Sequence, residues 1–158
     1  MIRLTKLADY GVVLMSHMAA EPDHLHTAAG LAREAWVSTA TAAKILKVLA
    51  RDGLLDSHRG ANGGYALARE ASRITVADII SAMEGPIAVT ECVDDSPVEC
   101  SVQSVCQVRG GWQKINDAVR RALEEITLVD MAETIHSNEA NPPENLIHIR
   151  RGAQPDRA

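Results

Sequence analysis

All three cysteines of the 158-residue chain lie in one segment that has no helical or strand period. They are Cys92, Cys100 and Cys106, spaced as Cys-x7-Cys-x5-Cys. Iron–sulfur clusters are held by thiolates at varied spacings on irregular loops, and their fourth ligand need not be cysteine. Zinc sites usually use closely spaced cysteine pairs, which this chain lacks, and a disulfide would leave one cysteine over. The spacing alone therefore favours an iron–sulfur cluster over zinc, but only modestly.

A second kind of chemistry is indicated by the uneven distribution of charge. The formal net charge of −5 argues against non-specific nucleic-acid binding by the whole chain, because phosphate binding requires Lys and Arg. Locally, residues 38–69 carry five basic and two acidic residues, whereas residues 84–100 carry five acidic residues and no Lys or Arg. The first segment suits a polyanion, and the second repels one.

The elements that must position the basic side chains are predicted from apolar periodicity, caps and turn residues. They are helices at about residues 5–20, 28–34 and 38–52 and strands at about 54–58 and 65–68. Thr27 and Ser38 are the expected N-caps of the second and third helices. Two short helices joined by a tight turn describe a helix-turn-helix, although a small helical bundle fits that part equally well. The β-hairpin that follows the second of these helices favours a winged helix over a helical bundle. Its glycine-rich turn lacks the Gly-Lys-Ser/Thr ending of a nucleotide-binding loop.

The C-terminal half is predicted to hold a dimerisation helix. Thr75 and Asp78 form a capping-box-like start for a helix that ends at Gly85-Pro86. A longer helix at about 111–126 carries apolar residues at alternating spacings of three and four, namely Trp112, Ile115, Val119, Ala122 and Ile126. This seam could dock on its own domain, but the polar remainder of the helix favours pairing with a second subunit. A further short helix is expected at 127–135.

The expected fold is therefore mainly α, a winged helix-turn-helix with a small β-hairpin wing and a long C-terminal dimerisation helix. Its segments are a DNA-binding domain at 1–85, a cysteine-rich cluster-binding loop at 86–108, the dimerisation helix with the short following helix at 109–135, and a disordered tail at 136–158.

Other classes of protein are excluded or disfavoured by the same sequence. No apolar run approaches the roughly 18 residues of a transmembrane helix, and no signal peptide is visible, so a cytoplasmic protein that binds no membrane is expected. No Ser/His/Asp arrangement or paired carboxylate stands out, and the six histidines are scattered. We therefore expect neither an enzyme nor a small-molecule substrate.

Several stretches resemble one family of winged-helix regulators. They are residues 1–11 (MIRLTKLADYG), 44–49 (KILKVL), 53–57 (GLLDS), 59–69 (RGANGGYALAR) and 74–80 (ITVADII). Together they resemble the Rrf-two family, which includes IscR, NsrR and RirA, over about residues 1–135. Residues 84–92 (EGPIAVTEC) and 106–112 (CQVRGGW) are most similar to the branch that regulates SUF-type iron–sulfur assembly. The resemblance implies a homodimer whose iron–sulfur cluster controls promoter binding; 2Fe–2S is favoured and 4Fe–4S is the alternative.

The fourth cluster ligand differs from the pattern of IscR. IscR has a histidine three residues after its third cysteine, and the matching residue here is Arg109, which stays protonated and cannot act as a ligand. NsrR instead uses an aspartate from the first helix of the partner subunit, and the matching residue here is Asp9. The alternatives are a nearby acid such as Glu99 or an exogenous group. Asp9 could also serve only as a first-turn acid that favours the helix dipole.

The predicted function is that of a cluster-dependent transcriptional repressor of SUF-type assembly genes. The alternatives are a nitric-oxide- or iron-responsive repressor of the same family and a cluster-free thiol-redox regulator. On the third helix and the wing, the residues expected to meet double-stranded operator DNA are Ser38, Thr39, Thr41, Lys44, Lys47 and Arg59.

Overall fold

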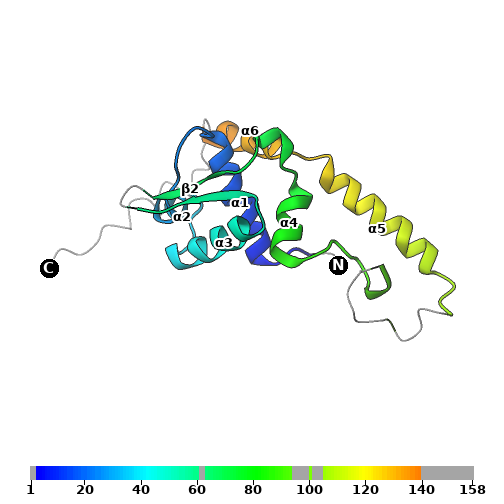
Figure 1. Ribbon diagram of the computed structural model, residues 1–158. Coiled ribbons are helices and arrows are strands. Elements are labelled where there is room, and N and C mark those ends of the chain that lie inside the picture. The colour runs from blue at the N-terminus through cyan, green and yellow to red at the C-terminus, as the bar shows by residue number, and fades with distance from the viewer. Residues whose placement is uncertain (1–2, 61–62, 94–99, 101–104, 140–158) are drawn as a thin grey trace.

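The computed structural model describes residues 3–60, 63–93, 100 and 105–139, and these form a mainly helical body with one β-hairpin (Figure 1). The helices are α1 (Lys6–Ala20), α2 (Ala28–Glu34), α3 (Thr39–Arg51), α4 (Val76–Glu84), α5 (Arg109–Glu124) and α6 (Leu128–Glu139). The strands are β1 (Leu55–His58) and β2 (Gly64–Leu67), and the 3-10 turns are η1 (Ala71–Arg73) and η2 (Glu91–Val93). The element order agrees with the sequence prediction, with strand boundaries shifted by one residue.

Side-chain caps set where the helices begin. The hydroxyls of Thr5, Thr27 and Ser38 each accept a hydrogen bond from the backbone N–H three residues on, at the starts of α1, α2 and α3. At α4 the expected capping box is complete, because Thr75 accepts from the N–H of Asp78 and the Asp78 carboxylate accepts from the N–H of Thr75. These caps confirm the predicted starts of α2, α3 and α4.

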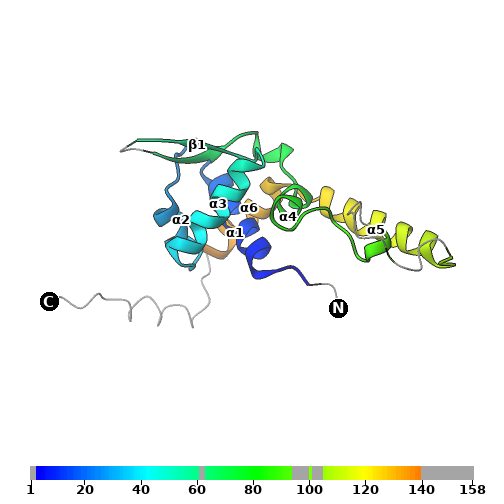
Figure 2. The same ribbon diagram turned by 60° about the horizontal axis from the view of Figure 1, so that its bottom comes forward.

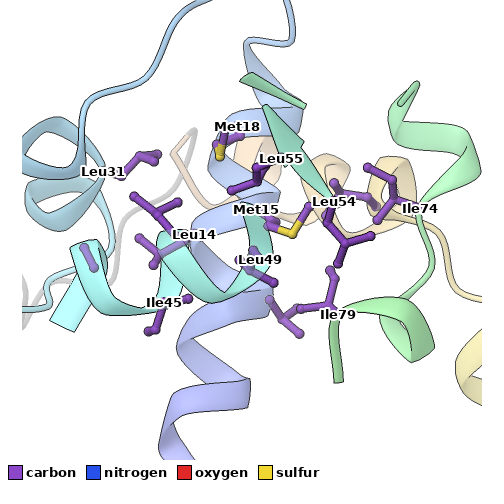
Figure 3. Packing of buried hydrophobic residues seen from close by; sticks show 14 of the residues in the cluster. Leu14, Met15, Met18, Leu31, Ile45, Leu49, Leu54, Leu55, Ile74 and Ile79 are labelled. Carbon is purple, nitrogen blue, oxygen red and sulfur yellow. The ribbon is translucent and has the colours of Figure 1, made fainter. Parts of the chain in front are cut away.

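The core is aliphatic and lies where α1, α3 and α4 meet beneath the hairpin (Figure 3). Its largest fully buried side chains are Leu14, Met15, Met18, Leu31, Ile45, Leu46, Leu49, Leu55, Ile74, Ile79 and Leu128. Gly11 lets α1 and α4 approach closely, because a Cβ there would lie 3.3 Å from Cγ of Met83. The periodic apolar face of α3 is thus buried, which leaves its other face to solvent.

The hairpin is attached to the body through the segment that joins α1 to α2. Strands β1 and β2 pair antiparallel, from Leu55 opposite Leu67 to His58 opposite Gly64. In addition, Tyr65 and His26 exchange two backbone hydrogen bonds of 2.8 and 2.9 Å. Gly64 permits this contact, because a Cβ there would lie 2.6 Å from the carbonyl oxygen of His26.

Helix α5 extends away from the rest of the described chain in both views, and α6 returns to it (Figure 1 and Figure 2). The backbone turns back at Thr127, where Leu128 donates to the carbonyl of Ile74 at 2.8 Å and α6 packs on α1. The sequence analysis grouped this helix with the dimerisation segment, whereas fully buried Leu128 makes it part of the winged-helix core. It also continues to Glu139, past its predicted end and into the segment expected to be a tail.

The remainder of the predicted tail, residues 140–158, lies outside the described residues. In the part of the chain that is described, no helix is long and apolar enough to cross a membrane.

Candidate nucleic-acid interface and cysteine loop

The outer face of α3 presents polar and basic side chains. Thr39, Lys44 and Lys47 are exposed, whereas the buried residues of the same helix are Ala42, Ile45, Leu46 and Leu49. The Ser38 hydroxyl accepts from the N–H of Thr41 at 3.1 Å and lies 2.8 Å from the Thr41 hydroxyl, so these two hydroxyls are held together at the helix start. The arrangement places a fixed polar N-terminus and two lysines on one accessible surface, as an interface with a nucleic acid requires.

A basic hollow of about 690 Å³ lies between the C-terminal half of α3, the start of α2 and the hairpin. Lys47 and Arg51 line it from α3, and His58 and Arg59 line it from the end of β1. Arg51 is fixed by a 3.1 Å bond from its Nε to Asp52, and its side chain remains 74% exposed. The predicted contacts Lys47 and Arg59 are thus brought together by the fold.

Arg51 and His58 were not among the predicted contacts. Helical spacing could have identified Arg51. Lys47 follows Lys44 by three residues and Arg51 follows Lys47 by four, so the three side chains lie on one face of the helix. His58 carries no comparable signal, because its place beside α3 depends on how the hairpin folds back. Residues 61–62 of the wing lie outside the described residues.

The N-terminal end of the cysteine loop is anchored on α5. The N–H of Val89 donates to Oδ1 of Asn116 at 3.0 Å, and Asn116 is buried although most of α5 is exposed. Cys92 is buried in η2, which packs on α5, and its Sγ lies 3.2 Å from Oγ1 of Thr90. Cys92 therefore has a defined position against the helix.

The other two cysteines are more accessible. Cys100 and Cys106 are partly exposed, and all three thiols are free. Among the described residues, no group of three His, Cys, Asp or Glu side chains lies close enough to hold a metal ion. Most of the loop between the cysteines, residues 94–99 and 101–104, falls outside the described part, Glu99 included. The fold thus places the three cysteines on one connection without gathering their sulfur atoms.

Asp9 is exposed in the first turn of α1. The neighbouring N-cap residue Thr5 donates its N–H to the carboxylate of Glu84 at 2.7 Å, which joins the start of α1 to the end of α4. The sequence analysis placed Asp9 opposite the cysteines of a second subunit, so its proposed partner atoms are not in this chain.

The seam of α5 is largely uncovered. Trp112 and Ile115 on α5 are 38% and 46% exposed, and Ile126, two residues beyond the end of the helix, is 42% exposed. The seam that the sequence predicts to pair with a second subunit is therefore accessible in this chain.

These features match a known family over almost the whole described chain. The family model for Rrf2, described as an iron-dependent transcriptional regulator, matches residues 4–134. The chain belongs to the Rrf2 family. Rrf2 proteins are DNA-binding transcriptional regulators and not enzymes, and the mainly helical body with its two-stranded hairpin is the winged-helix fold that the sequence predicted.

Individual relatives support the same assignment. The chain is 33% identical to protein aau3 of Rhizobium meliloti over 132 residues, which is 84% of this chain and 86% of that protein. It is similar to the structure of CymR, the global cysteine regulator of B. subtilis, with a TM-score of 0.67 and 30% identity over 85% of this chain and 98% of CymR. For IscR of T. potens the TM-score is 0.63, with 27% identity over 93% of this chain and 96% of IscR.

Proposed function

We propose that this Rrf2 protein is an iron–sulfur-dependent repressor that binds operator DNA as a homodimer and controls genes of SUF-type cluster assembly. The observation that carries the proposal is the position of the three free cysteines. They lie on the connection that leads from α4 of the winged-helix domain to the start of α5, where a change in the loop can alter how the two parts are arranged.

The donor set fits an iron–sulfur cluster in its chemistry. Cys92, Cys100 and Cys106 supply three thiolates, which such clusters prefer, and Asp9 of a second subunit supplies a carboxylate oxygen as the fourth ligand. When bound, the cluster supplies iron charge that offsets the anionic thiolates and the acidic residues of the loop. Cys100 and Cys106 must approach Cys92 for this, and their partial exposure leaves them free to do so.

The residues of the chain itself couple the loop to the DNA-binding domain. Val89 is bonded to Asn116 on α5, and the residues just before it follow directly from α4, whose side chains are part of the core. A cluster bound by both Cys92, in η2, and Cys106, just before α5, would also fix the C-terminal end of this connection. The angle between the winged-helix domain and α5 would then be fixed, and with it the spacing of the two recognition helices in a dimer.

The DNA contacts follow from the accessible face of α3 and the hollow beside it. In this proposal α3 enters the major groove, with Ser38, Thr39 and Thr41 at base edges and Lys44 and Lys47 at phosphates. Arg59 on the wing reaches the flanking minor groove. Lys47 and Arg51 line one wall of the hollow, so a phosphate strand passing between α3 and the wing would meet cations on both sides.

A cluster-free thiol-redox regulator is the second candidate, and one observation favours it. The chain is similar to the oxidized form of Staphylococcus aureus CymR, with a TM-score of 0.61 and 28% identity over 84% of this chain and 97% of that one. In such a regulator the partly exposed Cys100 and Cys106 would be the reactive thiols.

Iron and acid-labile sulfide content of anaerobically purified protein separates the two candidates. The proposal predicts a coloured protein with stoichiometric iron and sulfide. Each of Cys92→Ala, Cys100→Ala and Cys106→Ala should lose the colour and retain the helical circular dichroism. Asp9→Ala should alter the spectrum or the lability of the cluster, whereas Asp23→Ala, another exposed acid, should change neither. Colourless wild-type protein with redox-dependent DNA binding would favour the thiol regulator instead.

A further inference from the structure

Trp36, in the turn of the helix-turn-helix, has an unusual backbone conformation. Its φ is +56°, and among the described residues it is the one non-glycine with positive φ; the others are Gly53, Gly60 and Gly85. The left-handed region crowds the Cβ of an L-residue against its own backbone, so glycine and sometimes asparagine are usual there.

The local hydrogen bonds explain how this conformation is held. Ala35 donates its N–H to the carbonyl of Leu31, and Val37 donates to the carbonyl of Ala32 at 3.0 Å. The second bond is the 6→1 bond of a Schellman motif, which places Trp36 at the position after the C-cap that strongly prefers glycine. Ala35 and Val37 both pack against the core. The turn is thus fixed from both sides, and nothing in it requires a tryptophan.

The side chain of Trp36 does little for the core. It is 54% exposed, more than Trp112, and it does not belong to the core cluster or to the residues packed on it. A large aromatic therefore stands largely in solvent on a backbone that would be less strained with glycine. Strain retained in this way, without a packing reason, indicates a functional role.

The position of Trp36 in the helix-turn-helix indicates that DNA is the partner of its side chain. Trp36 lies two residues before Ser38, the N-cap of α3, and the first turn of α3 carries the exposed Thr39. In helix-turn-helix proteins the N-terminal residues of this second helix contact base edges and the first helix crosses the sugar–phosphate backbone. We infer that the turn joining the two helices lies close to that backbone. An indole suits that location, because its face packs on sugar while Nε1–H, a donor only, can bond a phosphate oxygen.

We propose that Trp36 is a DNA-contacting residue that lays its ring along the operator backbone at the edge of the major groove and donates Nε1–H to a phosphate. This inference rests on the proposed use of α3 as the recognition helix. It adds a neutral contact to the basic ones. Because an indole displaces no counterion, its loss should weaken binding without changing the salt dependence, unlike the loss of a lysine.

The test uses the wild-type protein and operator DNA selected with it from random duplexes. The chain has two tryptophans, so an emission change that wild type shows and Trp36→Phe lacks is assigned to Trp36. We expect operator binding to shift or quench that emission. Trp36→Ala and Trp36→Gly should each bind about tenfold more weakly, as for loss of a bond to a charged group, with an unchanged slope of log K against log salt. Trp36→Phe should lie between them and wild type, because it keeps the ring and loses the donor.

The pair of small substitutions also checks the strain. Both remove the same indole contacts, but only Trp36→Gly relieves the positive φ, so its Tm should exceed that of Trp36→Ala by about 3 °C. The inference is wrong if the emission does not respond to the operator and Trp36→Ala binds within about twofold of wild type. In that case a loss of affinity in Lys47→Ala would show that the proposed function still holds. If wild-type protein selects no operator and Lys47→Ala has no effect, the proposed function fails as well.

Discussion

Gly64→Ala should separate the wing from the segment that holds it. The new Cβ would lie 2.6 Å from the carbonyl oxygen of His26 and 3.0 Å from Cγ of Leu25. Because the first of these is a backbone atom, it cannot move away as the end of a flexible side chain could. The β2 strand must therefore shift away from His26, and the two backbone hydrogen bonds between His26 and Tyr65 should be weakened or lost.

The size of the effect follows from these two bonds. Each contributes about 1 kcal/mol to the free energy of unfolding, so Gly64→Ala should lower it by about 2 kcal/mol, or about 5 °C in Tm. Because Arg59 sits at the end of β1 and lines the hollow with Lys47, operator affinity should also fall several-fold. Thermal unfolding and fluorescence anisotropy with a labelled operator measure the two effects separately.

Gly110→Ala is the matched control. A Cβ at Gly110 meets nothing within 4 Å, and the residue is in the first turn of α5, so this substitution should not lower the free energy of unfolding. If Gly64→Ala is as stable as wild type and binds the operator equally well, the close approach of β2 to His26 does not anchor the wing.

Three further changes test separate parts of the structure. Lys47→Ala should weaken binding about evenly across sequences and reduce the salt slope by about one per subunit, whereas Lys114→Ala on α5 should not; equal slopes would remove Lys47 from the phosphate contacts. Thr75→Ala removes the capping box and should lower the free energy of unfolding by about 1 kcal/mol in urea titration, and an unchanged midpoint would show that the cap is not limiting. Hydrogen bonds from the side chain and backbone of Thr127 lower the pKa of Asp130, so its contribution to stability is present at neutral pH and is lost as the pH falls through that lowered pKa. The stability difference between wild type and Asp130→Asn should accordingly shrink on acidification, and a constant difference would contradict this assignment.

The local structure of the winged-helix domain could be predicted because its signals are local. Thr27, Ser38 and Thr75 cap the helices that their types and positions indicated. The hairpin followed from a glycine-rich turn between two short segments that were predicted to be strands. Each of these features depends on residues within a few positions of one another, which a sequence displays directly.

Features that depend on distant segments were missed or left open. The packing of α6 on α1 buries Leu128 in the core, although the sequence around it showed only another short helix. The hollow that joins His58 to Arg51 depends on the path of the hairpin across α3. Trp36 gave no signal at all, since its type disfavours the left-handed conformation that the two flanking hydrogen bonds impose. The role of Asp9 depends on a second subunit.

The central claim, that the cysteine loop controls DNA binding through an iron–sulfur cluster, is tested most directly by comparing operator affinities of the two forms. Anaerobically purified holo protein and the same preparation freed of iron by a chelator are titrated against one operator at one fixed salt concentration. We expect the holo form to bind about tenfold more tightly or better, within the usual range of coupling between two sites. Equal affinities for the holo and apo forms would contradict the account, even if the cluster itself were present.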